Sequence, residues 1–188
     1  MNKRLVIGIT GASGAILGIE LLKVMQDYPG WETHLVISRG AELTIMQETK
    51  FKPSEVGQLA TKVYHIGDIG ASIASGTFKT EGMVIVPCSM KTLAGIATGY
   101  SDNLLLRAAD VTIKERRKIV LVARESPLSC IHLKNMLYLA NLGASIIPPM
   151  MTFYNKPVGM EDLIRHILGK ILSVFDIELN GFKRWGEN

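Results

Sequence analysis

The stretch from Arg4 to Ala15, RLVIGITGASGA, decides the fold. Its first part, Leu5 to Ile9, is a run of aliphatic and β-branched residues, which is typical of a buried strand. Glycines stand at positions 8, 11 and 14, and apolar residues at helical spacing come directly after them. A strand, a glycine turn and an amphipathic helix in this order indicate the first unit of a parallel sheet covered by helices.

The same alternation of short β-branched runs and helical stretches continues through the chain. It predicts an α/β protein with a three-layer, Rossmann-like or flavodoxin-like fold and a mostly parallel sheet. We expect strands over residues 4–9, 33–38, 62–65, 82–86, 118–122 and 145–147. We expect helices over residues 15–26, 41–48, 91–98, 103–114, 133–142 and 160–175, with Gly143 as a helix stop. The polar segment 67–80 is expected to be a long connection beside the sheet.

Length and composition limit the class of protein. The 188 residues fit one core, so we expect a single domain over residues 1–188. Apolar residues make up 47% and charged residues 20%, which argues against a disordered or fibrous chain. Aromatic residues make up only 6% and the basic residues behind the net charge of +4 are mostly scattered, which disfavours a nucleic-acid binder. No apolar run reaches about 18 residues, which disfavours a membrane span.

The cysteines and the first residues of the chain indicate the cellular compartment of the protein. Cys88 and Cys130 stand among apolar residues without a nearby Cys or His, so we expect two buried thiols and neither a disulfide framework nor a metal site. The basic and apolar start resembles a signal peptide, but the strand, turn and helix pattern favours a structural role. We therefore expect a cytoplasmic protein.

Functional residues of such folds lie outside the carboxyl ends of the strands. At these positions the sequence has GASG at 11–14, SRG at 38–40, PCSMKT at 87–92 and RESP at 124–127. Glycine amides, hydroxyl groups and cations suit an anion, and the helix that begins near Ala15 would add the positive end of its dipole. The sequence therefore predicts contacts to a phosphate group or a flavin.

Plainer interpretations stand beside this one. The glycine spacing differs from the dinucleotide fingerprint, and Ser38 stands where an NAD binder usually has an acid, which favours a mononucleotide. A glycine turn without a ligand and a simple helix cap at Ser89 are equally compatible with the sequence. Arg124 and Glu125 form a charge pair at a strand end, which favours catalysis or binding, and Glu48 is a candidate second acid.

Other polar residues are ordinary when each is considered alone. Arg107 is expected on a helix surface, and most of the basic run 114–118 at a solvated helix end. His132 is expected to act as a helix cap. Tyr154 and Lys170 need no special explanation if they are exposed.

Several separated motifs together resemble one family. They are GASGA at 11–15, VPCSMKTLAGIATGYSDNLLLRAADVTIKERR at 86–117, VARESPLSCIHLKNMLYLANLGASIIP at 122–148 and FYNKP at 153–157. The chain resembles the UbiX-type flavin prenyltransferases, long described as phenylacrylic or aromatic acid decarboxylases. The resemblance implies a metal-independent enzyme that joins the dimethylallyl group of dimethylallyl phosphate to reduced FMN. The product, prenylated FMN, would serve a partner UbiD-type decarboxylase in phenolic acid degradation or ubiquinone biosynthesis.

The resemblance also implies roles for individual residues. FMN would be bound by Gly11, Ala12, Ser13, Ser38, Ser89, Met90, Lys91, Thr92 and Arg124. The prenyl phosphate would be bound by Arg107, Lys114, Arg124, Tyr154 and Lys170. Catalysis would involve Ser13, Glu48, Lys114 and Glu125, with proton transfer assigned to Glu125. Cations placed around the phosphate would stabilise the charge that develops as it leaves.

Two positions depart from the family pattern. Ile69 stands where some members have tryptophan, and Lys170 stands where many have arginine, so phosphate binding is expected to weaken without being lost. The alternative functions are a flavin-dependent decarboxylase and an FMN-binding carrier. Such decarboxylases carry a PASANT-like segment, and the corresponding segment of this chain is IASGTF at 73–78. The resemblance implies a homo-dodecamer, for which the apolar segment 148–153 is a plausible contact surface.

Overall fold

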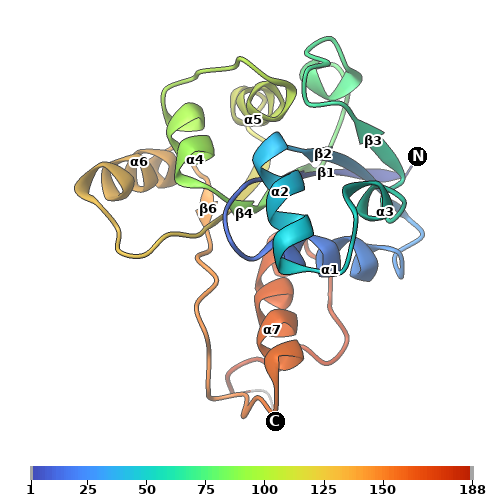
Figure 1. The fold of residues 1–188 in the computed structure, drawn as a ribbon, viewed down its shortest axis with the longest axis vertical. Coiled ribbons are helices and arrows are strands. Elements are labelled where there is room, and N and C mark those ends of the chain that lie inside the picture. Colours follow the sequence, from blue (N-terminus) through green and yellow to red (C-terminus); the bar gives the residue numbers. More distant parts are fainter. Residues whose placement is uncertain (1, 187–188) are drawn as a thin grey trace.

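The computed structural model describes residues 2–186 and places their strands in one parallel sheet (Figure 1). The strand order is β3-β2-β1-β4-β5-β6. The strands are β1 (Lys3–Ile9), β2 (Trp31–Ile37), β3 (Lys62–Tyr64), β4 (Gly82–Cys88), β5 (Lys118–Ala123) and β6 (Ser145–Ile146). Every neighbouring pair runs parallel, which confirms the expected α/β fold. Ligands of such folds bind where the strand order changes direction, at the carboxyl ends of β1 and β4.

Helices cover both faces of the sheet (Figure 1). They are α1 (Ala15–Met25), α2 (Arg39–Glu48), α3 (Pro53–Gly57), α4 (Met90–Ala97), α5 (Leu104–Lys114), α6 (Cys130–Asn141) and α7 (Met160–Ser173), with a 3₁₀ turn at Ser72–Ala74. Buried residues of α1, α2 and α7 pack in one core and those of α4 and α5 in a second, so the three expected layers are present. Among the helices of residues 2–186, none has both the length and the apolar character needed to cross a membrane.

The strand β1 contributes to both cores. Leu5, Ile7 and Ile9 pack with α1 and α7, whereas Val6 belongs to the core on the opposite face. Side chains of a strand point alternately to its two faces, and here both faces are covered. This is why the segment is apolar throughout instead of alternating with polar residues.

Helix boundaries differ from the expected ones for local reasons. The helix α3 was not expected, because its five residues, starting at Pro53, are too few to show a helical period. The helix α6 begins at Cys130, three residues earlier than expected, because Ser129 and His132 cap it reciprocally. The His132 amide donates to the Ser129 hydroxyl and the Ser129 amide to His132 Nδ1, both at 3.2 Å. The expected cap at His132 and the helix stop at Gly143, with φ of 92°, are confirmed.

The two cysteines differ in environment. Cys88 is fully buried in β4, and burial raises the pKa of its thiol to about 12, which keeps it protonated and unreactive at neutral pH. Cys130 is exposed, so the expectation that it is buried was wrong. The reason is that α6 buries only Leu139 among the residues of its helical span, while its apolar residues Ile131 and Leu133 face outward.

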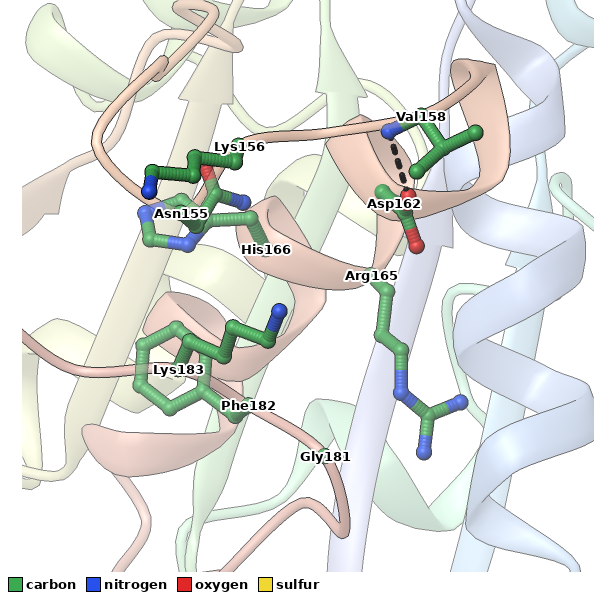
Figure 2. Close-up of a pocket in the computed structure, with 9 residues that line it drawn as sticks. All are labelled: Asn155, Lys156, Val158, Asp162, Arg165, His166, Gly181, Phe182 and Lys183. Atoms are coloured by element: carbon green, nitrogen blue, oxygen red, sulfur yellow. Dashed lines mark hydrogen bonds between the residues drawn. The ribbon is translucent and has the colours of Figure 1, made fainter. Parts of the chain in front are cut away.

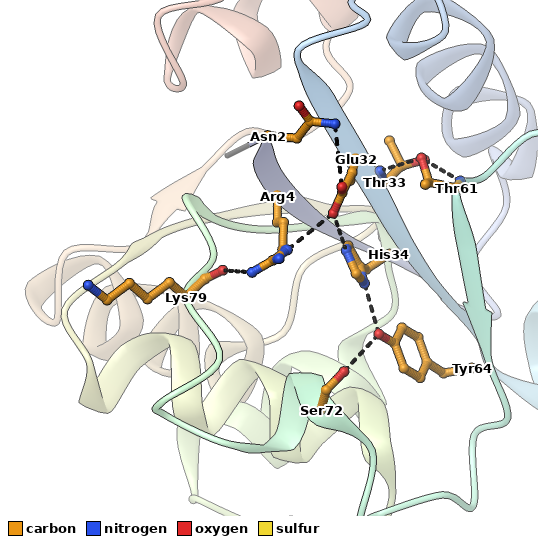
Figure 3. A network of polar contacts seen from close by, with 9 residues as sticks. All are labelled: Asn2, Arg4, Glu32, Thr33, His34, Thr61, Tyr64, Ser72 and Lys79. Atoms are coloured by element: carbon orange, nitrogen blue, oxygen red, sulfur yellow. Dashed lines mark hydrogen bonds and ion pairs between the residues drawn. The ribbon is translucent and has the colours of Figure 1, made fainter.

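The connection between β3 and β4 is held against the sheet by polar contacts (Figure 3). The buried His34 shares a 2.8 Å hydrogen bond with the Tyr64 hydroxyl, which lies 2.9 Å from the Ser72 hydroxyl. Arg4 donates to the Lys79 carbonyl at 3.4 Å. Burial lowers the pKa of His34, so its ring is neutral at pH 7. These contacts fix a segment whose first residues reach the strand ends.

Arg117 also holds this connection. It belongs to the basic run that was expected to be mostly solvated, but its guanidinium donates to the Phe78 carbonyl at 2.9 Å and to the Gly76 carbonyl. Carbonyls of a segment outside the sheet need donors from elsewhere, and Arg117 supplies them. Lys114, Arg116 and Lys118 are exposed, as expected.

Close packing of α1 on the sheet leads to a stability prediction. A Cβ atom at Gly18 would lie 2.6 Å from the Val86 carbonyl oxygen and 2.9 Å from Ile9 Cδ1. Because that oxygen belongs to the backbone, we expect Gly18→Ala to lower the free energy of unfolding by about 1–3 kcal/mol in urea titrations. Gly30→Ala is the control, since nothing lies within 4 Å of its Cβ position. Equal effects of the two substitutions would contradict this account.

Candidate active site

A cavity of about 570 Å³ lies at the carboxyl ends of the central strands. Five of the predicted cofactor residues line it: Gly11, Ser38, Ser89, Lys91 and Thr92. The rest of the lining comprises Arg39, Gly40, Ile66, Gly67, Asp102, Asn103, Leu105 and Leu106. Residues 66–67 and 102 lie in connections and Asn103 lies at a helix start, and none of them was predicted to be part of the site.

Three helices begin at this cavity, and a polar side chain caps each of them. The Ser38 hydroxyl accepts a hydrogen bond from the Ala41 amide at 3.2 Å, and the Ser89 hydroxyl from the Thr92 amide at 3.3 Å. Asn103 caps α5 in the same way. The helix-cap interpretation of Ser89 is therefore confirmed. Three helix N-termini facing one cavity, together with the cations Arg39 and Lys91, make it suitable for a phosphate group.

The glycines at this edge permit close contact between backbone segments. A Cβ atom at Gly11 would lie 2.9 Å from the Gly40 carbonyl carbon. The loop after β1 therefore lies directly against the start of α2. Gly14 has φ of 106°, in the left-handed region that favours glycine, immediately before α1.

The first turn of α1 binds a side chain of the chain itself. The Glu48 carboxylate accepts hydrogen bonds from the Gly14 amide at 2.8 Å and the Ala15 amide at 3.2 Å. Partial burial raises the pKa of Glu48, but hydrogen bonds from Ser13 and the two amides and the nearby charge of Arg124 outweigh it, so the pKa lies below its usual value. The positive end of α1, expected to face a ligand, thus holds a carboxylate. The structure brings Ser13 and Glu48 together, as their predicted shared role requires.

A second cavity, of about 270 Å³, lies at the carboxyl end of β5. Arg124 and Glu125 line it together with Ala123, Leu128, Met136, Pro148, Pro149 and Met150. The Arg124 amide donates to the Cys88 carbonyl at 3.1 Å, which places this cavity next to the start of α4. One cation and one carboxylate against an apolar wall suit a ligand with an apolar body and an anionic end. Within residues 2–186, no group of three or more His, Cys, Asp or Glu side chains is arranged to hold a metal ion.

The remaining cofactor residues are close to the first cavity without lining it. Ala12 is buried in the loop after β1. Met90, the first residue of α4, packs against the core that contains α4 and α5. Their side chains therefore support the backbone of the two loops, and the Ala12 amide is itself bonded to the Thr10 carbonyl at 2.9 Å.

Tyr154 and Lys170 lie apart from the strand ends. Tyr154 belongs to the segment that leaves the sheet after β6 and runs toward α7 (Figure 1). Its hydroxyl is 3.4 Å from His166 Nε2. Burial and then the charge of Lys170 lower the pKa of His166, so Lys170 shares this neighbourhood. His166 also lines a cleft of about 250 Å³ with Lys156 and other residues of the C-terminal region (Figure 2).

Arg107 and Lys114 line neither of the two cavities. Arg107 forms an ion pair with Asp110 on α5, and Lys114 Nζ lies 3.0 Å from Glu115 Oε1. The helix α5 starts at the first cavity and its eleven residues extend about 16 Å toward the opposite edge of the sheet. Within a single chain, Lys114 is therefore not at the strand ends. The resemblance to the family had implied that its charge would act there.

Comparisons with known proteins identify the family. Residues 1–175 match the family described as Flavoprotein. A probable UbiX-like flavin prenyltransferase of Sedimentibacter hydroxybenzoicus is 57% identical over 182 residues, which cover 97% of this chain and 96% of that protein. This chain belongs to the UbiX-like flavin prenyltransferases of the flavoprotein family. The resemblance carried by the sequence motifs is thus confirmed.

Solved structures agree with this assignment. A structure described as AnUbiX (PadA1) in complex with FMN and dimethylallyl pyrophosphate is 49% identical, covers 100% of both chains and has a TM-score of 0.97. A dodecameric FMN-dependent UbiX-like decarboxylase from Escherichia coli O157:H7 is 48% identical, covers 97% of this chain and 98% of that chain, and has a TM-score of 0.95. Solved cysteine decarboxylases are below 20% identical and share the fold alone.

The hydrogen bonds of Glu48 lead to a pH prediction. Because its pKa is lowered in the folded protein, the ionised carboxylate stabilises the fold above the usual glutamate pKa, and this stability is lost as pH falls through the lower value. Glu48→Gln should therefore lower the unfolding free energy at pH 7 by about 0.5 kcal/mol, with the difference shrinking toward pH 3. Urea titrations across this pH range measure the effect. Glu81→Gln, at an exposed position before β4, is the control, and a difference independent of pH would refute the assignment.

Proposed function

We propose that this chain transfers the dimethylallyl group of dimethylallyl phosphate to reduced FMN and so produces prenylated FMN. One observation carries the proposal: a phosphate-suited cavity and a cavity with a cation, a carboxylate and an apolar wall lie at the carboxyl ends of β4 and β5, which the hydrogen bond from the Arg124 amide to the Cys88 carbonyl joins. The first suits the flavin nucleotide and the second an allylic phosphate. The family membership and the ligands named for AnUbiX support the same substrates.

The first cavity would bind the phosphate end of FMN. The hydroxyls of Ser38 and Thr92 are available as donors, and Arg39 and Lys91 supply positive charge. A phosphate dianion gains most from donors and cations that are already in place before it binds. When bound, reduced FMN supplies the electron-rich ring that accepts the prenyl group.

The second cavity would receive the prenyl group. Transfer breaks the bond between the allylic carbon and the phosphate oxygen and forms one bond between that carbon and the flavin, while the ring atom that is alkylated releases its proton. Glu125 would accept it, and the support is that Glu125 lines the cavity and one of its oxygens is held at 3.0 Å by the Ser126 amide. Arg124, which lines the same cavity, would stabilise the leaving phosphate. The apolar residues Leu128, Met136 and Pro149 would exclude water, which would otherwise trap an allylic cation.

Assembly would complete the site. We propose a homo-dodecamer, as described for the relative from Escherichia coli O157:H7, in which Arg107, Lys114, Tyr154 and Lys170 reach the prenyl phosphate of a neighbouring copy. The support is that apolar side chains are exposed along α6 and the segment after β6: Leu128, Ile131, Leu133, Leu137, Tyr138, Leu142, Met150, Met151 and Phe153. Apolar patches of this extent mark contact surfaces.

The product would be passed to a UbiD-type decarboxylase of aromatic or phenolic acids. Prenylated FMN is made by this reaction for use elsewhere, so a recipient enzyme is required. A cytoplasmic location fits an unpaired, exposed thiol at Cys130, because such thiols persist in a reducing compartment.

A single assay tests the proposed reaction. Purified protein, reduced FMN and dimethylallyl phosphate are incubated without oxygen, and the flavin is analysed by mass spectrometry. We expect the flavin to gain the dimethylallyl group, and a parallel reaction with dimethylallyl diphosphate shows which donor is preferred. A flavin that binds but stays unmodified with both donors would exclude the prenyltransferase and leave an FMN carrier.

Glu125→Gln tests the proton-transfer role. We expect the rate of flavin prenylation to fall by about a hundredfold or more, because the amide cannot accept the proton. Binding of FMN should change little, since Glu125 lines the second cavity and not the first. Glu81→Gln serves as the matched control. Loss of FMN binding in Glu125→Gln, or an unchanged rate, would disprove the assigned role.

A further inference from the structure

Thr10 is a buried polar residue in the loop after β1 that is assigned no role above. Its side chain is 1% exposed. Its hydroxyl donates to the Pro87 carbonyl at 2.7 Å and accepts a hydrogen bond from the Ser89 amide at 2.8 Å, while its own amide donates to the same carbonyl at 3.2 Å. Three hydrogen bonds therefore join this one residue to the end of β4.

These contacts lie beyond the last paired residues of β1 and β4. The pairing of β1 with β4 extends from Leu5 opposite Gly82 to Gly8 opposite Ile85. Beyond that point the two strands diverge, and the loops that follow them line the first cavity. Thr10 thus sets the position of the β4 loop relative to the β1 loop.

A series of hydrogen bonds with fixed donors and acceptors leads from Thr10 through Ser89 to Thr92 in the cavity. The Pro87 carbonyl can only accept, so the Thr10 proton is committed to it and the Thr10 oxygen receives the Ser89 amide. The Ser89 hydroxyl donates to Thr92 Oγ1 at 3.1 Å. The proton of the Thr92 hydroxyl is then left to point to another acceptor, and Ser89 and Thr92 both line the cavity.

We propose that Thr10 is a positioning residue that holds Ser89 and thereby directs the Thr92 hydroxyl, as a donor, at the phosphate of the bound flavin. The inference rests on the proposed function, because it assumes that FMN is the ligand of this cavity. It assigns Thr10 to recognition of the phosphate and not of the flavin ring. Its effect should therefore depend on whether the ligand carries a phosphate.

The test compares FMN with riboflavin, which lacks the phosphate, by fluorescence titration. Thr10→Val keeps the shape of the side chain and removes the hydroxyl, and we expect it to weaken FMN binding about tenfold or more. Riboflavin affinity should change less than about twofold, so the preference for FMN over riboflavin is lost. Thr10→Ser, which restores the hydroxyl, should recover most of the FMN affinity.

The control is Thr112→Val. Thr112 is likewise buried, and its hydroxyl donates to the Ala108 carbonyl at 2.7 Å within α5. This substitution should leave both affinities unchanged. The inference is overturned if Thr10→Val binds FMN like the wild type, if it loses FMN and riboflavin equally, or if Thr10→Ser fails to restore binding. Failure of the wild-type protein to bind FMN would instead refute the proposed function.

A second measurement applies if Thr10→Val does not fold. Thr92→Val removes only the last donor of the series and leaves the link between β1 and β4 in place. We expect it to reduce FMN affinity about tenfold while riboflavin affinity is kept. An equal loss for both ligands, or no loss, would refute a phosphate-directed hydroxyl at Thr92 and with it the role of Thr10.

Discussion

The parallel pairing of β1 with β2 on one side and β4 on the other is the constraint on which the site depends. Because these three strands end at the same edge, the loops that follow them meet there, and the helices that follow the loops begin there. The residues after β1 need room for two backbones to touch, which Gly11 provides against Gly40. The position of the cavity is therefore a consequence of strand order, and its chemistry is a consequence of the few residues at each strand end.

Polar groups at these strand ends are held by other groups of the chain. The carboxylate of Glu48 occupies the first amides of α1, and Thr10 binds the end of β4. Polar groups that are held in this way lose little conformational entropy when a ligand binds. The hydrogen bonds that they make to the ligand are therefore gained at a small entropic cost. The occupied end of α1 also leaves the starts of α2, α4 and α5 as the helix ends that face the first cavity. The proposed phosphate binding at that cavity and the carboxylate binding at α1 would thus be separate functions of neighbouring loops.

Much of the fold follows from the sequence because periodicity and burial act locally. The central strands β1, β4 and β5 were predicted because a strand covered on both faces is apolar along most of its length. The strand-end motifs then located Ser38, Ser89 and Arg124. Other features depend on contacts distant in sequence. Cys130 has apolar neighbours in the sequence yet is exposed, since Leu139 is the one residue of α6 that is buried. The lining residue Asp102 comes from a connection that has no period to recognise, and Asn103 lines the cavity at a helix start where the sequence predicted only a helix.

The positions of Lys114, Arg124 and Lys170 show why only part of the site can be predicted from a single chain. Expelling a phosphate from an allylic carbon without a metal requires several positive charges around it. Arg124 lies at the cavity that suits the prenyl group, whereas Lys114 lies at the far end of α5 and Lys170 lies near His166. The resemblance groups these residues around one proposed substrate, but sequence motifs do not say which copy of the chain supplies each of them. The exposed apolar surface of α6 is the physical reason to expect several copies, and their contacts would then decide how these charges meet.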